Sequence, residues 1–517
     1  MEQLPTVSET ENENKNARTP FVWRTILCWT LGLAFMALCA YVYYRGAAYN
    51  AEFVNRNSSL GDQSSYMEYA RDIYHNRHDP DSNVLGDRNR MPGYPFIQSF
   101  FYDAAKSDQI VPQVSLLKSL FGKPKIELKG RASEYAPERD REFFDRGKSV
   151  NIYLSIVLLI ILFFIFRFHI PTLAATSITL VLAFGVFIFK AGYFQAELLF
   201  YFAFFISFLL MFHTLRRPSP WLGALAGVAA GLAHLIKAGM LPILCIFVAV
   251  YMVREIVLLA IRIFRPTASA LARQSRFIWR IVTLALTLVC FLATLWPYIQ
   301  TSKRVFSQYF YNVNSTFYIW YDNWKDVDNP KTGTKAHGDR VGWPDLPQQL
   351  LPSASKYWHE HTTEQIQSRL SKGFGSMLRE SYDHFWFLKY VCLYLLLTIA
   401  IIVSRPIASC RGVASGWKAV VLIFFCIYCA AYLFLIAFYA PISASGTTRF
   451  LLANMAPLLF TLAYFSTRER LKATTLRLNA TRLTPMHFHG AVIVMMLADI
   501  PFAVWPRLMD AAKFGGF

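Results

Sequence analysis

Charged residues are scarce in this 517-residue sequence, at 16% of the total, whereas an ordinary soluble domain carries roughly a quarter. Together with 55% hydrophobic residues and a mean hydropathy of +0.31, this scarcity excludes a soluble globular enzyme. The 44 Phe, 27 Tyr and 12 Trp stand in long apolar runs, which excludes intrinsic disorder for most of the chain. The composition therefore predicts a polytopic membrane protein.

Cysteine pairs and nucleotide-binding patterns are also lacking. Seven of the eight cysteines lie inside apolar runs, so the sequence has no disulfide framework and no zinc-ligand spacing. Walker, dinucleotide-binding and nucleophile-elbow patterns are absent, and no internal repeat is visible. These absences argue against ATP-driven and dinucleotide-dependent chemistry.

The net charge of +19 is unevenly distributed. Sixteen Lys or Arg, against only Glu255 and Glu469, stand in four connecting segments: 216–217, 254–280, 404–418 and 467–482. These segments contribute +14 of the net charge and all lie on one side of the membrane in the topology given below, as the positive-inside rule predicts for cytoplasmic loops. Nucleic acid is therefore not needed as a partner to explain the basic character.

Eleven apolar segments are long enough to cross a hydrocarbon core of about 30 Å as helices. We therefore expect an all-α membrane protein of about eleven transmembrane helices. The segments are 22–44, 149–168, 171–190, 194–215, 220–236, 239–261, 278–298, 386–404, 417–440, 449–466 and 489–506.

The polar ends and connections define the topology. Residues 1–21 are rich in Glu and Asn and predict a short disordered cytoplasmic tail, and the apolar run after them lacks a small-residue cleavage site, so we expect a retained anchor. With the N-terminus inside, the C-terminus emerges outside. Residues 22–517 then form one membrane domain with two large extracytoplasmic loops, 45–148 and 299–385.

The first loop carries signals of interfacial helices. Ser65 and Glu68 have the spacing of a capping box that opens a helix. Residues 95–105 and 112–121 are amphipathic, and we expect them to lie along the outer interface.

Three basic residues depart from the sidedness of the charge. Lys190, Lys237 and Arg449 each lie at the outer end of a span. Ionisable groups at membrane depth usually face the bundle interior or a water-filled cavity, and a cluster of cations there suits a lipid phosphate. The alternative, in which each side chain snorkels to the outer headgroups, stays open from the sequence alone.

Five segments carry a resemblance to a known family. They are Asp62-Gln-Ser-Ser-Tyr66-Met-Glu-Tyr-Ala-Arg71, Arg90-Met-Pro-Gly-Tyr94-Pro95, Phe194-Gln-Ala-Glu197, Gly227-Val-Ala-Ala-Gly-Leu-Ala-His-Leu-Ile-Lys237 and Arg449-Phe-Leu-Leu-Ala-Asn-Met-Ala-Pro457. In this order and sidedness they resemble the C-type membrane glycosyltransferases, which include the aminoarabinose and protein O-mannosyl transferase families. The resemblance covers residues 22 to about 465.

The resemblance implies a reaction, in which a sugar moves from a polyprenyl-phosphate donor to an acceptor hydroxyl on the extracytoplasmic face. It implies Asp62 as the base, with Arg90, Lys190, Lys237 and Arg449 binding the donor phosphate. One base and one displacement imply inversion at the sugar, since a retaining route needs a second carboxylate as nucleophile. No cofactor is certain, and a divalent metal stays open.

Several of these residues have a second interpretation. Asp62 is alternatively a helix N-cap, and Glu197 either holds a substrate hydroxyl or pairs with Lys190. The aromatic residues that stack on a sugar or are simply structural at an interface are Tyr66, Tyr69, Tyr94 and Tyr193.

Other positions bear on metal use and on the acceptor. His337-Gly-Asp339 and His359-Glu-His361 suggest a metal, although histidines two apart without further ligands are more often solvated surface. Gln63 stands where protein mannosyl transferases have a second acid, and Arg90-Met-Pro-Gly replaces the family's Lys-Pro-Pro turn. These departures leave the acceptor open among a glycolipid, a polysaccharide and a protein.

Two further questions concern the membrane and the class of function. A bacterial inner membrane is expected, but outward-facing sequons at Asn57 and Asn314 keep the endoplasmic reticulum open. A transporter or flippase of lipid-linked sugars is the second hypothesis, disfavoured because the unusual charges gather at one face and no repeat is seen. A catalytically silent scaffold is the third.

Overall fold

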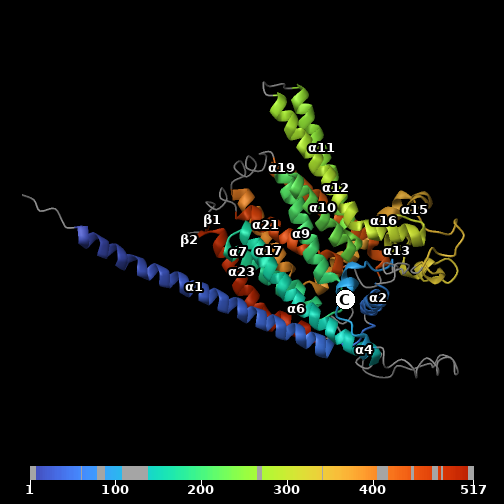
Figure 1. The fold of residues 1–517 in the computed structure, drawn as a ribbon, viewed down its shortest axis with the longest axis horizontal. Coiled ribbons are helices and arrows are strands. Elements are labelled where there is room, and N and C mark those ends of the chain that lie inside the picture. The colour runs from blue at the N-terminus through green and yellow to red at the C-terminus, as the bar shows by residue number, and fades with distance from the viewer. Residues whose placement is uncertain are drawn as a thin grey trace, which may run out of the picture.

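The structure is a computed structural model. It describes residues 7–59, 61–77, 88–107, 138–264, 270–339, 342–404, 417–443, 448–467, 476–478 and 481–510. Over these residues the chain forms a bundle of long helices with a cap of shorter helices at one end (Figure 1).

The bundle is built from helices and helical turns that span most of the chain. In order they are α1 (Val7–Tyr49), η1 (Asn50–Val54), α6 (Glu138–His169), α7 (Thr172–Leu182), η3 (Ala183–Phe187), α8 (Ile188–Ala191), α9 (Glu197–Arg216), α10 (Pro220–Ile236), η4 (Ala238–Met240), α11 (Leu241–Phe264), α12 (Ala270–Phe306), α17 (Leu388–Ser404), α19 (Trp417–Tyr439), η7 (Ala440–Ile442), α20 (Thr448–Leu452), α21 (Met455–Ser466), α23 (Pro485–Asp499), η8 (Ile500–Val504) and α24 (Trp505–Met509).

Shorter elements follow α1 and α12 and form the cap. They are α2 (Gln63–Asn76), α3 (Gly93–Ser99), α4 (Ala104–Ser107), α13 (Val313–Thr316), η5 (Tyr318–Trp320), α14 (Trp324–Val327), η6 (Thr334–His337), α15 (Ala354–Glu360) and α16 (Thr363–His384). The last of these, α16, meets α17 at an angle of 106°.

The prediction of a helical membrane protein is confirmed. In the described part of the chain, nine helices are long and apolar enough to cross a membrane, and the bent pair of α16 and α17 makes ten when it is counted as one span. Each of the eleven predicted segments contains a helix, but α10 is only 17 residues long. The count of eleven spans therefore stays a prediction.

Several predicted boundaries differ from the observed ones. Helix α1 begins at Val7, inside the segment 1–21 for which a disordered tail is expected, because Glu, Lys, Arg and Ala there are compatible with a helix. Helix α2 begins at Gln63, so the predicted capping box at Ser65 is wrong. Helices α3 and α4 occupy the predicted interfacial segment 95–105, whereas 112–121 lies outside the described residues.

One short hairpin departs from the all-α prediction. Strands β1 (Leu476–Leu478) and β2 (Thr481–Leu483) pair antiparallel, with Arg477 opposite Arg482. The Leu-Arg-Leu and Thr-Arg-Leu triplets alternate with a period of two, which is the pattern of a strand. The prediction counted this segment only as a basic cytoplasmic loop.

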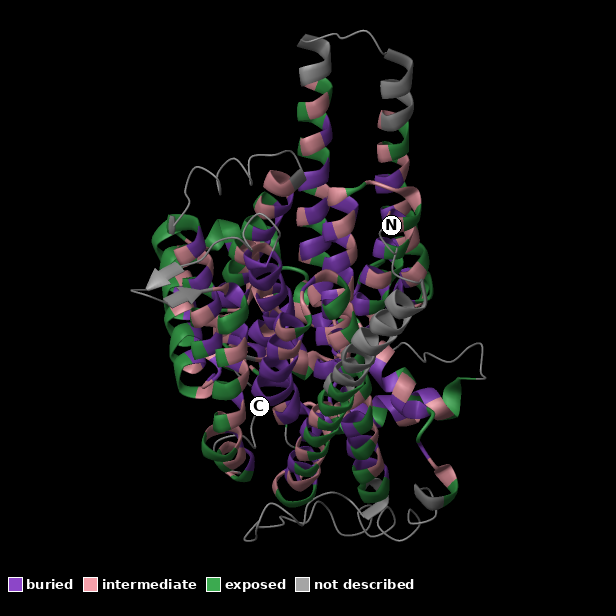
Figure 2. Cartoon of the chain, turned by 90° about the vertical axis from the view of Figure 1, so that its left-hand side faces the viewer, coloured by how far each residue is buried: buried purple, intermediate pink, exposed green. Residues whose placement is uncertain are grey.

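The centre of the bundle consists of three spans. The segments Thr172–Ala191, Glu197–Arg216 and Arg449–Ser466 are 78%, 67% and 72% buried, against 22% for the first and last spans. Figure 2 shows these central helices as the purple interior, with exposed residues around them. Because Lys190, Glu197 and Arg449 stand at or next to one end of each of these three spans, charged residues of the predicted site lie on the most enclosed helices.

The two large polar loops lie at the same end of the bundle. In Figure 1, α2 and α4 from the first loop and α13 and α15 from the second lie at the right, whereas β1 and β2 lie at the left of the bundle. Segments far apart in the sequence thus meet at one rim. This arrangement agrees with the predicted topology, in which both loops face the same side.

Close packing of α10 against α12 sets the position of the residues that follow α10. A Cβ at Gly227 would lie 2.2 Å from the Thr287 carbonyl oxygen, and one at Gly223 would lie 2.4 Å from that of Thr283. Small residues four apart let helix backbones approach closely in membranes. The glycines therefore fix the end of α10, where Lys237 begins the next segment.

We expect Gly227→Ala to destabilise the protein, because the added methyl group has to displace the backbone of α12. Overpacking of this kind costs about 1–3 kcal/mol. The measurement is the midpoint of thermal unfolding in detergent. Gly375→Ala, at a helical position with nothing within 4 Å, is the matched control and should leave the midpoint unchanged or raise it. Equal effects of the two substitutions would contradict the close packing.

Candidate functional site

Asp62 lies in a turn that directs its carboxylate away from the helix it precedes. Gly61 adopts a left-handed backbone with φ of 62°, which glycine accepts without strain, and α2 begins directly after Asp62. Asp62 occupies the N-cap position, but its side chain makes no capping hydrogen bond. Asp62 is therefore the N-cap residue by position, but its side chain does not cap the helix.

Gln63 fastens this turn to the bundle. Its side-chain oxygen accepts hydrogen bonds from the Asn55 amide, at 2.8 Å, and from the backbone N–H of Phe194, at 2.9 Å. The Asn55 amide also donates to the Gly192 carbonyl at 2.8 Å. Gln63, which stands where protein mannosyl transferases have a second acid, is thus buried and hydrogen-bonds the start of α2 to the connection between α8 and α9.

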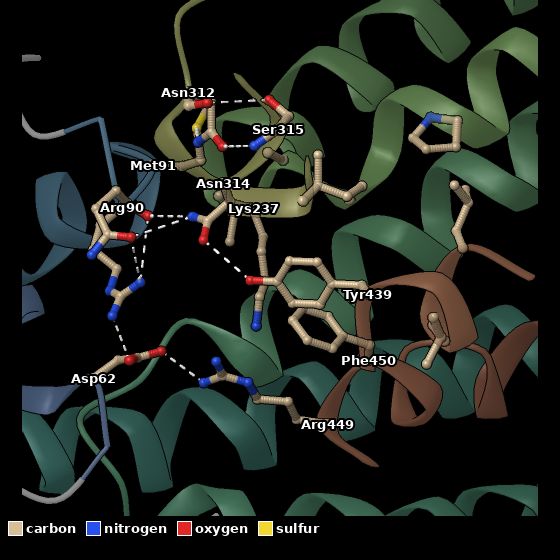
Figure 3. A pocket seen from close by; sticks show the side chains of 18 of the residues that line it. Asp62, Arg90, Met91, Lys237, Asn312, Asn314, Ser315, Tyr439, Arg449 and Phe450 are labelled. Carbon is tan, nitrogen blue, oxygen red and sulfur yellow. Dashed lines mark hydrogen bonds and ion pairs between the residues drawn. The ribbon is translucent and has the colours of Figure 1, made fainter. Parts of the chain in front are cut away.

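Two arginines hold the Asp62 carboxylate from opposite ends of the chain. Arg90 Nη2 donates to Oδ1, and Arg449 Nη1 donates to Oδ2 at 2.7 Å (Figure 3). Arg90 precedes α3, and a Cβ at Gly93 of α3 would lie 2.8 Å from the Leu235 carbonyl oxygen of α10. Close contact between α3 and α10 therefore brings Arg90 to the same rim as Lys237.

A second carboxylate lies behind the first. Lys237 Nζ donates to Glu197 Oε1 at 2.9 Å, and Arg449 Nη1 lies 3.8 Å from the same oxygen. The ring of Phe450 covers the Lys237 ammonium at 5.0 Å. The direct partner of Glu197 is thus Lys237, and the charge of Lys190, which the sequence-based alternative named as the partner, also acts on this carboxylate without a direct ion pair.

These charges do not cancel. Asp62, Glu197, Arg90, Lys237 and Arg449 form one connected group, in which three cations face two carboxylates and leave a net charge of +1. All five side chains are at most 17% exposed. A net positive charge in such an enclosed group favours an anionic ligand.

The group borders a cavity of ≈ 240 Å³. Its charged members are Asp62, Arg90, Lys237 and Arg449, whereas Glu197 does not line it. Much of the remaining wall is apolar and includes Pro242 of α11 and Leu435 and Ile436 of α19. The cavity thus joins a cationic end to an apolar wall.

Amide and hydroxyl groups form a further edge of this cavity. Asn89, Asn312, Asn314 and Ser315 line it, and Asn314 Nδ2 donates to the carbonyl and side-chain oxygens of Asn89, each at 3.3 Å (Figure 3). Tyr439 Oη donates to Asn314 Oδ1 at 3.2 Å. Sequence reasoning missed this edge, although the Asn-x-Asn-Ser pattern in the aromatic-rich start of the late loop was a visible signal.

Lys190 lies apart from the other predicted phosphate ligands. Its residue is 5% exposed and it lines a second cavity, whose walls include Arg449 but not Asp62, Arg90 or Lys237. Arg449 is the one charged residue that lines both cavities among those described. The structure therefore brings together Arg90, Lys237 and Arg449 around Asp62, and places Lys190 on a neighbouring site.

The tyrosines divide into two sets. Tyr66 lines the first cavity, and the guanidinium of Arg90 lies 5.7 Å from its ring. Tyr94 is fully buried, with its hydroxyl bound to the amides of Gln98 and Asn151, and Tyr193 is 2% exposed. Stacking on a sugar stays a prediction for Tyr66 because it lines the cavity, whereas Tyr94 and Tyr193 do not line it, which favours their structural interpretation.

The histidines of the late loop lie in local contacts. His361 Nε2 lies 3.0 Å from Asp322 Oδ2, and its ring stacks on Tyr357. His337 Nε2 lies 3.2 Å from the Pro330 carbonyl. Within the described ranges, no three His, Cys, Asp or Glu side chains are grouped as a metal site requires.

The charges around Asp62 control its ionisation. Burial alone raises the pKa of the Asp62 carboxyl, but the positive charges of Arg90 and Arg449 outweigh burial and hold this pKa well below its usual range. Asp62 is therefore an ionised carboxylate at every physiological pH.

Comparisons with known proteins give a structural likeness. Among solved structures, the chain is similar to the crystal structure of ArnT from Cupriavidus metallidurans in the apo state, at 12% sequence identity, over 84% of this chain and 77% of that chain, with a TM-score of 0.29. No family model and no curated protein sequence matches the chain. At this TM-score the likeness carries no functional assignment, so the function is argued from the site itself.

The ion pairs of Asp62 should make stability depend on pH in a defined direction. Because its pKa is lowered on folding, its stabilising contribution is complete above about pH 4 and is lost as the pH falls further. Asp62→Asn removes the carboxylate that both enclosed arginines contact and should cost about 3 kcal/mol at neutral pH. Thermal unfolding of both proteins over a pH series measures the difference.

The exposed carboxylate of Asp345, in the late loop, gives the matched control. Asp345→Asn should unfold like the wild type at each pH. A gap between wild type and Asp62→Asn that already closes near pH 6 would contradict the lowered pKa.

Proposed function

We propose that the chain is a membrane glycosyltransferase that moves one sugar from a polyprenyl-phosphate donor to an acceptor hydroxyl on the extracytoplasmic face, with inversion. The observation that carries this proposal is the placement of a single carboxylate, Asp62, between two guanidiniums at the wall of a cavity that also has an apolar side. The sequence resemblance to the C-type glycosyltransferases points to the same chemistry.

The charge of the group suits the donor. A polyprenyl-phosphate sugar is a phosphodiester with one negative charge, and the group around Asp62 has a net charge of +1. Arginine binds phosphate oxygens through two parallel N–H groups, and lysine acts as a point charge. Arg90, Arg449 and Lys237 therefore serve as the ligands of the donor phosphate.

The apolar wall suits the polyprenyl chain. Helices α11 and α19 contribute Pro242, Leu435 and Ile436 to the cavity, and the corresponding spans are each only 33% buried, so their remaining surface faces lipid. A chain that lies in the bilayer is thus continuous with this wall. At ≈ 240 Å³ the cavity accommodates the sugar and phosphate, while the hydrocarbon stays in the membrane.

The polar edge suits the sugar. Asn89, Asn314 and Ser315 present amide and hydroxyl groups, which donate to and accept from hydroxyls. Their place beside Arg90 puts a sugar next to the phosphate to which it is bonded. We assign these three residues to sugar recognition in addition to Tyr66.

Asp62 is the base that accepts the proton of the acceptor hydroxyl. In the free protein its two arginine partners make it a weak base, because they lower its pKa. A bound donor phosphate competes for Arg90 and Arg449 and so restores basicity to Asp62 when the donor is in place. Base activation is thereby coupled to donor binding.

The charge also balances through the reaction. As the acceptor oxygen bonds to the anomeric carbon, the bond from that carbon to the phosphate oxygen breaks and Asp62 takes the proton. The leaving phosphate gains one negative charge and the protein group gains one positive charge, from +1 to +2. Preorganised cations that match charge as it develops lower the barrier.

Inversion follows from the use of one carboxylate. A retaining reaction needs a second carboxylate that attacks the sugar. Glu197 is 1% exposed, does not line the cavity and is bound by Lys237. Its role in the proposal is to orient Lys237 and Arg449.

The proposal places the protein in a bacterial inner membrane. Asn314, in one of the two sequons, lines the cavity and donates to Asn89, so an N-linked glycan there would occupy the sugar site. A membrane without N-glycosylation of this sequon is therefore the compatible one.

Asp62→Asn should lower sugar transfer by about 10²–10⁴-fold, because it removes the base while keeping the side-chain size. The assay uses purified protein in lipid nanodiscs with labelled polyprenyl-phosphate sugars and an acceptor extract, and measures the labelled product. Asp345→Asn is the control and should transfer at the wild-type rate.

The same assay separates the proposal from its rivals. Undiminished transfer by Asp62→Asn would eliminate the proposed base. Movement of the donor across a vesicle membrane without a new glycosidic bond would identify a flippase instead.

The pH profile of transfer gives an independent check on Asp62. Since its pKa is lowered in the free protein, kcat/KM for the donor should show no loss from Asp62 until the pH falls below about 4. Arg90→Gln removes one of the two charges and should move this acidic limb to higher pH. An acidic limb at the same pH in both proteins would mean that another group limits the reaction.

A further inference from the structure

A second cavity lies beside the one that contains Asp62. It has a volume of ≈ 50 Å³. Its walls come from η3, α8, the bend between α16 and α17, and α20. Among its lining residues are Lys190, Trp386 and Arg449. A water molecule needs roughly 10–15 Å³ of such space, so the cavity has room for a small polyatomic group.

Three hydrogen-bond donors at this cavity lack acceptors among the described residues. Lys190 Nζ makes no hydrogen bond and no ion pair within the described ranges, and the ring of Tyr193 lies 5.7 Å from it. Trp386 Nε1 and Arg449 Nε are buried, and no acceptor is bound to either in the part of the chain that the structure describes. Buried donors are nearly always bonded, so three around one space call for an acceptor there.

The ordinary explanation of Lys190 is that it neutralises Glu197. Glu197 is already paired with Lys237 at 2.9 Å and lies 3.8 Å from Arg449, which gives that carboxylate two cations before Lys190 is counted. Lys190 itself is only 5% exposed. An ammonium group enclosed to this degree is costly unless an anion accompanies it.

We propose that this second cavity binds a phosphate oxyanion, held by Lys190 Nζ, Trp386 Nε1 and Arg449 Nε. All three groups donate and none accepts, so the site selects a ligand with several acceptor oxygens and a negative charge. A neutral hydroxyl ligand has too few acceptor sites for three donors. This binding does not depend on sugar transfer, because the charges around Asp62 already match a donor without Lys190.

The bend between α16 and α17 forms one wall of the site. The chain turns by 106° there, and Trp386 lies between Phe385 and Phe387, both of which are buried. A Cβ at Gly185 of η3 would lie 3.0 Å from Phe387, so the bend is pressed against η3. Trp386 thus lines the same cavity as Lys190 at the end of α8. The anion belongs either to a lipid headgroup or to free phosphate, which share this chemistry.

The test observes Trp386 directly. The full-length protein is labelled with 5-fluorotryptophan in nanodiscs of phosphatidylcholine, and its ¹⁹F resonance is assigned by its loss in Trp386→Phe. Inorganic phosphate is titrated in one arm, and phosphatidic acid is included in the nanodisc in the other. We expect the Trp386 resonance to shift in at least one arm, and that arm identifies the source of the anion.

Two variants decide whether Lys190 holds the anion. Lys190→Met should raise the apparent dissociation constant by about tenfold or more, because it removes a charge-assisted hydrogen bond. Lys331→Met, at an exposed lysine that lines neither cavity, is the matched control and should keep the wild-type shift of Trp386. Lys190→Arg should retain part of the binding and guards against a folding defect in the Met variant.

A Trp386 resonance that moves in neither arm overturns the proposal. So does a shift that is equal in the wild type and in Lys190→Met. The two proposals can fail separately. Absence of sugar transfer with an intact Trp386 response would contradict the proposed function alone, and sugar transfer without a Trp386 response would contradict the anion site alone.

Discussion

The double ion pair of Asp62 organises the rim of this protein. One carboxylate receives Arg90 from 28 positions later and Arg449 from 387 positions later, so three distant parts of the chain meet at two oxygens. Burying such charges is favourable only when each is paired, and removing one partner leaves the others uncompensated. The pair therefore fixes the first loop, α3 and α20 relative to one another, and every other feature of the cavity is arranged around it.

The architecture explains why these charges are tolerated. The three most enclosed spans end at the rim, and they bring Lys190, Glu197 and Arg449 there on rigid helices. Close packing of α10 against α12 through its glycines places Lys237 at the same rim. Groups held on packed helices keep their geometry better than groups on loops, which suits a site that has to be preorganised. The short helices of the late loop then supply the uncharged edge.

The sequence was sufficient for the class of fold and for part of the site. Sidedness of charge made Lys237 and Arg449 conspicuous, since cations at the outer ends of spans need a reason, and both contact the acidic residues. The same reasoning grouped Lys190 with Lys237 and Arg449. Lys190 instead lines a second cavity, whose wall includes the bend between α16 and α17, and such a bend is a tertiary feature. Asn314 was interpreted as a sequon because its approach to Asn89 is a tertiary contact between loops 225 residues apart. The hairpin of β1 and β2 lay in a segment that composition marked only as basic.

Arg449 borders both cavities, and its guanidinium is divided between them. Nη1 lies between Asp62, which lines the first cavity, and Glu197 behind it, whereas Nε has no acceptor in the described part of the chain. A ligand that draws this planar group toward one side alters the hydrogen bonds available on the other. Thermodynamic reciprocity then requires that two occupants influence each other's affinity by the same factor. Under the two proposals above, this single side chain is the direct link between the two cavities.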